Sequence, residues 1–63
     1  MRVEAQAYID RIRDKFLSGD DYGVFTIMQE LNEDMDLYCE VFSVFPASMR
    51  RMLKEIQVQY RDK

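Results

Sequence analysis

Apolar residues recur at steps of three and four along this chain, and the pattern predicts four amphipathic helices. The first helix is expected over residues 3–17, with charged residues between its apolar ones. Its apolar residues are Ala5, Tyr8, Ile9, Ile12, Phe16 and Leu17. The segment Ser18-Gly19-Asp20-Asp21 then breaks the pattern, and the spacing of Ser18 and Asp21 resembles a helix N-cap. A second helix is therefore expected to start at once.

The second predicted helix, residues 21–31, has an unusually wide apolar arc. Tyr22, Phe25 and Met28 mark one stripe. Val24 and Ile27 extend the arc beyond what one buried face requires. We therefore expect this helix to pack against two neighbours.

Two further helices are predicted over residues 35–45 and 46–61. Pro46 is expected to open the last helix, because a proline is tolerated only in the first turn. Its apolar face is formed by Met49, Met52, Leu53, Ile56 and Tyr60. Since all connections are short, the sequence predicts an all-α fold: a four-helix bundle with antiparallel neighbours, as a single domain over residues 1–63.

Charge and composition narrow the classes of partner. The net charge of −3 repels phosphate, so no direct binding of nucleic acid is expected. No apolar run is long enough to cross a membrane. Basic residues accumulate toward the C-terminus, at Arg50, Arg51, Lys54, Arg61 and Lys63. We interpret them as a solvated face that suits the helix macrodipole. The lone Cys39 favours a reducing compartment, the nucleus or the cytosol.

The residues that catalysis or metal binding would need are missing. With no histidine and a single cysteine, a zinc site of the usual type cannot be assembled. Two glycines do not make a phosphate-binding loop, and Cys39 has no histidine to activate it. The sequence therefore predicts no enzyme activity, no cofactor and no metal.

The first two predicted helices carry a more specific pattern. Residues 5–16 read Ala-Gln-Ala-Tyr-Ile-Asp-Arg-Ile-Arg-Asp-Lys-Phe, and Tyr22, Phe25 and Met28 follow after a short polar turn. This pattern resembles the paired amphipathic helix domain of the Sin-type transcriptional corepressors, which are scaffolds that recruit histone deacetylases. The second half is similar to the family's third and fourth helices more weakly.

The resemblance implies a hydrophobic cleft between the first two helices that takes an amphipathic helix from a DNA-bound repressor. It implies nuclear localisation and these peptide-binding residues: Ala5, Gln6, Ile9, Phe25, Thr26, Gln29 and Ile56. It also implies that Tyr8, Ile12, Phe16, Tyr22 and Met28 belong to the core. Polar residues stand at three groove positions that are commonly aliphatic in the family, so a more polar groove is expected. If Ile9 faces the cleft, Ile9→Asp should leave the fold intact.

Two other readings of the chain stay open. One is a related helical hub, such as the harmonin-homology domain of scaffold proteins. The other is a self-associating small helical protein, since marginal size makes oligomerisation a route to stability. A helix receptor is expected to be a monomer, whereas the last reading predicts a homodimer.

Overall fold

The computed structural model describes residues 2–61, and these form four α-helices without a strand. The helices are α1 (Val3–Leu17), α2 (Asp21–Leu31), α3 (Met35–Phe42) and α4 (Ala47–Arg61). The all-α prediction is confirmed. The third helix is shorter than predicted, because a residue before a proline is disfavoured in helical conformation and Phe45 precedes Pro46. The last helix accordingly begins after Pro46.

The end of α1 is fixed by a Schellman motif. Gly19 has a positive φ of 79°, which a residue without a side chain adopts at no steric cost. The amide of Gly19 donates to the carbonyl oxygen of Phe16 at 3.2 Å, and the amide of Asp20 donates to that of Lys15 at 3.0 Å. These two bonds stop α1 and turn the chain toward α2.

Asp20, and not Ser18, caps the N-terminus of α2. The Asp20 carboxylate accepts a hydrogen bond from the backbone amide of Gly23 at 2.9 Å. The Ser18 hydroxyl instead donates to the carbonyl oxygen of Lys15 at 3.0 Å, at the end of α1. The predicted cap was therefore misplaced by two residues, because Ser18 is still needed to finish the preceding helix.

Replacing Asp20 with Ala should lower the free energy of unfolding by about 1 kcal/mol, because the first turn of α2 loses its cap. Asn at the same position should restore most of that loss, and Ser18→Ala should change stability far less. Urea unfolding followed by circular dichroism measures all three. Equal losses for Asp20→Ala and Ser18→Ala would contradict the assignment of the cap.

Helix α2 lies at the centre of the bundle. It contacts α1, α3 and α4, and α1 also contacts α3. Val24 and Ile27 are both buried, so the prediction that α2 has more than one neighbour is confirmed. The core residues are Ala5, Ile9, Ile12, Val24, Ile27, Met28, Leu31, Leu37, Val41, Phe42, Phe45, Leu53 and Ile56. Met52 was expected on this buried face and is half-exposed, because it lies about 100° around the helix from Leu53.

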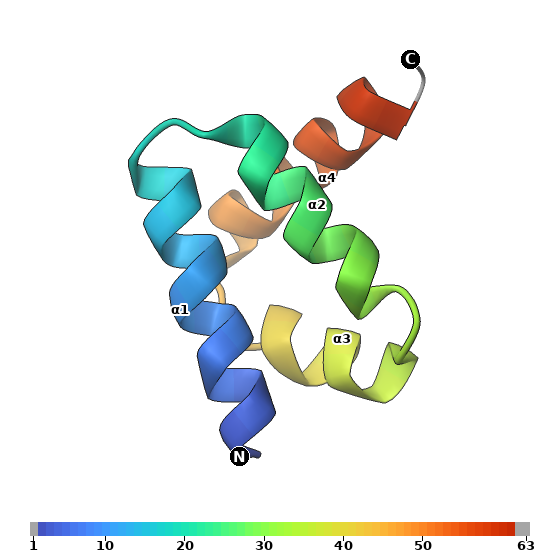
Figure 1. Ribbon diagram of the computed structural model, residues 1–63. Coiled ribbons are helices and arrows are strands. Elements are labelled where there is room, and N and C mark those ends of the chain that lie inside the picture. The colour runs from blue at the N-terminus through green and yellow to red at the C-terminus, as the bar shows by residue number, and fades with distance from the viewer. Residues whose placement is uncertain (1, 62–63) are drawn as a thin grey trace.

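Figure 1 shows that the helices are not all aligned as up-and-down neighbours. α1 and α2 run in opposite directions on either side of their short turn. α3 crosses near the lower ends of both, and α4 passes behind α2 toward the upper right. The C-terminal end of α4 and the N-terminal half of α2 therefore lie at one end of the molecule, with α3 at the other.

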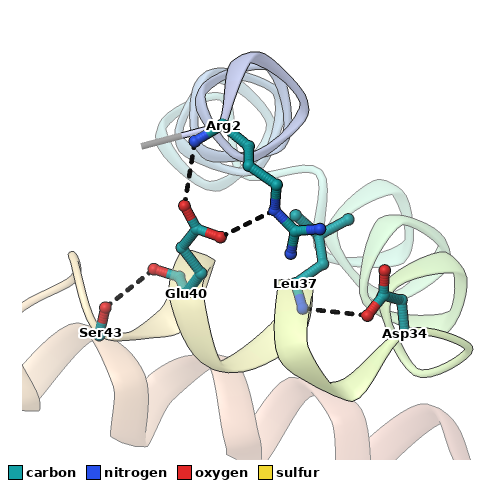
Figure 2. Close-up of polar contacts among 5 residues, drawn as sticks. All are labelled: Arg2, Asp34, Leu37, Glu40 and Ser43. Atoms are coloured by element: carbon teal, nitrogen blue, oxygen red, sulfur yellow. Dashed lines mark hydrogen bonds and ion pairs between the residues drawn. The ribbon is translucent and has the colours of Figure 1, made fainter.

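Two hydrogen bonds between Arg2 and Glu40, which we call the polar clasp, connect the residue before α1 to α3, as Figure 2 shows. The backbone amide of Arg2 donates to Oε1 of Glu40 at 3.1 Å, and its Nε donates to Oε2 at 3.0 Å. Within α3, the Asp34 carboxylate caps the amide of Leu37 at 3.2 Å. The Ser43 hydroxyl donates to the carbonyl oxygen of Glu40 at 2.8 Å. A helix of eight residues is marginal alone, so these bonds help to define α3.

The clasp gives a pH dependence that can be tested. The backbone amide of Arg2, and then its side chain, lower the pKa of Glu40. A carboxyl group with a lower pKa in the folded state stabilises the fold above its unfolded pKa, and this contribution is lost as pH falls through the folded pKa. Arg2→Ala should raise the pKa of Glu40 only part of the way, because the backbone amide still donates. Side-chain carboxyl NMR titration measures this, and an unchanged pKa in the variant would refute the role of the guanidinium.

Candidate interaction surface

The three apolar residues of the predicted groove on α1 and α4 belong to the core. Ala5 is 0% exposed, Ile9 is 1% exposed and Ile56 is 8% exposed. They contact the chain's own apolar side chains in this structure, so a ligand could reach them only if the helices moved apart. The expectation that Ile9 faces an open cleft is wrong for this state, because α1 uses that side to pack on its neighbours.

The three polar residues of the predicted groove are exposed, and only two of them, Thr26 and Gln29, lie together. Gln6 donates from its side chain to the Asp10 carboxylate at 3.0 Å, within α1. The Thr26 hydroxyl donates to the carbonyl oxygen of Gly23 at 2.8 Å, within α2. Gln6 also lies about 200° around α1 from Tyr8, the residue that borders α2. The structure therefore separates Gln6 from Thr26 and Gln29.

An open depression of about 450 Å³ does lie between α1 and α2. It is lined by Tyr8, Thr26, Gln29, Glu30 and Glu33. Two predicted groove residues are among them, and the expected polar character is present. The hydrophobic cleft itself is not confirmed, because carboxylates and uncharged polar groups form most of this lining.

Two ion pairs connect α1 with α2 and with the N-cap residue of α2. Arg11 pairs with Glu30 at 3.3 Å and places its guanidinium 5.4 Å from the centre of the Tyr8 ring. Nearer the turn, Lys15 pairs with Asp20 at 3.6 Å. Exposed pairs of this kind contribute little stability. The Arg11–Glu30 pair nevertheless includes a residue of the depression's lining, where a partner helix would lie.

Aromatic side chains gather instead between α2 and α4. The rings of Tyr22 and Phe25 are 6.4 Å apart, and each lies 5.6 Å from the ring of Tyr60. We call Tyr22, Phe25 and Tyr60 the aromatic surface cluster. Tyr22 is 61% exposed, so its expected place in the core is wrong. Phe25 and Tyr60 are half-buried and pack against the core.

The sequence predicts only part of this cluster. Tyr22 and Phe25 are three residues apart, which places them as neighbours on α2. Tyr60 comes from the last turns of α4, and no local pattern says that α4 packs beside the start of α2. Only the tertiary arrangement brings the three rings together.

The basic residues of α4 form the other distinctive surface. Arg50, Arg51, Lys54 and Arg61 are exposed. Over residues 2–61 the ion pairs use Arg2, Arg11 and Lys15, and no cation of α4 takes part in one. Among these α4 cations only Arg61 lies in the last turn, so the macrodipole does not account for the others.

Other candidate chemistry does not converge in the part of the chain that the structure describes. No three acidic or cysteine side chains there come together in a way that would hold a metal ion. Cys39 is exposed. None of the four helices combines the length and the apolar character needed to span a bilayer.

Comparison of the chain with protein-family models, with curated proteins and with solved structures found no match.

Substitution of Ile9 distinguishes a core residue from a groove residue. Ile9→Ala should lower the free energy of unfolding by about 2–5 kcal/mol, and Ile9→Asp should unfold the chain because it buries an unpaired charge. Gln6→Ala, three residues away and exposed, should change it by less than about 0.5 kcal/mol. Chemical denaturation measures these differences. A folded Ile9→Asp variant would restore the original groove assignment.

Proposed function

We propose that this chain is a protein-interaction module that binds an amphipathic helix of a partner protein, rather than an enzyme. The observation that carries the proposal is the aromatic surface cluster. Its most exposed member, Tyr22, contacts two other rings from two different helices. A patch of this kind offers the aromatic anchors that dominate the binding energy of many protein interfaces.

The cluster differs from ordinary exposed apolar residues. Single apolar side chains on a surface are normal and need no explanation. Here three large rings lie in mutual contact, and two of them, Phe25 and Tyr60, also pack against the core, so that a ligand could cover the three together. The tyrosine hydroxyl groups also suit an interface, since one part of each side chain is apolar and the other can hydrogen-bond.

A helix is the partner that best fits this surface. Tyr22 and Phe25 are one turn apart on α2, and Tyr60 faces them from α4. An amphipathic helix with apolar residues at i, i+3 and i+4 presents one continuous apolar side, which can cover the three rings together. The border of α1 and α2 is less suitable, because the Arg11–Glu30 pair crosses it and its depression is polar.

The resemblance of residues 5–16 to the corepressor modules supports a more specific role. On that resemblance, the partner is a helix of a transcription factor or repressor, and the chain scaffolds a histone deacetylase complex in the nucleus. The docking face proposed here lies on α2 and α4, so it differs from the groove that the resemblance implies. The two share Phe25, which is a member of the aromatic surface cluster, and Ile56 lies one turn before Tyr60 on α4.

NMR titration of the labelled chain with an amphipathic helical peptide tests the proposal. We expect saturable shifts at Tyr22, Phe25 and Tyr60. Tyr22→Ala should weaken binding by about tenfold or more, because an anchor is truncated, while Tyr22→Phe should retain most of the affinity. Met35→Ala is the matched control, since Met35 is similarly exposed, at 57%, on α3.

The outcomes separate the proposal from its alternatives. Shifts confined to Tyr8, Thr26 and Gln29 would locate the site between α1 and α2 instead. If the mass in solution increased with protein concentration, and Tyr22→Ala removed this increase, the chain would self-associate through the same cluster. No saturable shift with any of a series of amphipathic peptides would refute the proposed function.

A further inference from the structure

We infer that the partner helix is acidic and that a basic stripe on α4, formed by Arg50, Lys54 and Arg61, recognises it. This inference rests on the proposed function and names the chemistry of the partner. It is carried by the geometry of the stripe, by the absence of ion pairs along it among residues 2–61, and by the charge of the rest of the chain.

The three side chains lie on one side of α4. Steps of four and seven residues separate them, and at 100° per residue they fall within an arc of about 40°. The stripe is about 16 Å long, since eleven residues separate its ends at 1.5 Å each. That length corresponds to about three turns of a partner helix.

No carboxylate within residues 2–61 pairs with the stripe, although acidic residues are common in this chain. Arg50 and its neighbour Arg51 also lie near the N-terminal end of α4, where the macrodipole disfavours a cation. The first turn of α4 has no acidic residue to offset them. A partner carboxylate would remove this unfavourable arrangement.

Charge is divided unevenly between α4 and the rest of the chain. Residues 1–46 hold four basic and ten acidic residues, a net charge of −6, whereas residues 47–61 hold four basic and one acidic residue, a net charge of +3. A nucleic acid longer than the stripe would meet the acidic part of the chain and be repelled. A short acidic helix can contact the stripe alone.

The stripe is joined to the aromatic surface cluster through Gln57. This residue is three positions before Tyr60, three after Lys54 and four before Arg61, so it neighbours all of them on the helix surface. Gln57 is itself half-buried. A partner helix seated on the cluster can therefore place apolar residues on the rings and carboxylates along the stripe. Complementary charge of this kind orients a partner and increases its association rate.

Two peptides that differ only in charge test the inference. Both carry the same leucine anchors, and one has Glu where the other has Gln on the flank of the apolar side. Isothermal titration at low ionic strength should show tighter binding of the Glu peptide, and added salt should reduce the difference. Lys54→Gln should weaken the binding of the Glu peptide by about twofold to fivefold and leave the affinity for the Gln peptide unchanged.

Arg13→Gln is the matched control, because Arg13 is an exposed cation of α1 without an ion pair in the described chain. It changes the net charge by the same amount as Lys54→Gln and should not alter the preference. The triple variant Arg50→Gln, Lys54→Gln, Arg61→Gln should bind both peptides equally. Circular dichroism verifies that each variant is folded.

Equal binding of both peptides by the unmodified chain would overturn the inference and leave the proposed function standing. If neither peptide bound, both the inference and the proposed function would be overturned. Tighter binding of a short DNA duplex than of the Glu peptide, lost in the triple variant, would assign the stripe to nucleic acid instead. A dimer that Lys54→Gln dissociates would assign it to a second copy of the chain, and either result would refute the acidic helix.

Discussion

The burial of α2 on several sides is the constraint on which the rest of the structure depends. Val24, Ile27, Met28 and Leu31 are all buried and Phe25 is half-buried, so at 100° per residue the covered side of α2 spans about 160°, wider than the stripe of about 100° that faces a core in an ordinary amphipathic helix. The other three helices pack on this arc. Since helices of 8 to 15 residues are marginal in isolation, each is stable here mainly through that contact.

This packing decides which surfaces remain for a partner. α1 turns Ala5 and Ile9 inward to cover α2, so the border between the two helices is left to polar and charged side chains. α2 also carries Tyr22 and Phe25 beyond the buried arc, where α4 covers them only in part. The apolar surface that is open to a partner therefore lies where α2 meets α4, and it shares only Phe25 with the groove that the family resemblance implies.

Charge and apolar surface complement each other in the proposed role. Most cations of the N-terminal half form ion pairs within the molecule. Arg2, Arg11 and Lys15 each pair with a carboxylate of a later segment. The cations of α4 are not used in this way within the described chain. Aromatic rings would supply the affinity of an interface at this end of the molecule, and the basic stripe would supply its orientation.

The sequence by itself determined the helices, because the 3.6-residue period and the local breakers act over a few residues only. It predicted the bounds of α1 and α2, the start of α3 and, within one residue, the start of α4. Two predictions were wrong: Ser18 was expected to cap α2 but belongs to the end of α1, and residues 43–45 were expected in α3 but lie between it and Pro46. The tertiary structure decided which helices became neighbours, and therefore that Ile9 is buried, that Tyr22 meets Tyr60 and that the α4 cations form no ion pair within residues 2–61. Periodicity fixes the side of a helix on which a residue lies, but only packing between distant segments decides what covers that side.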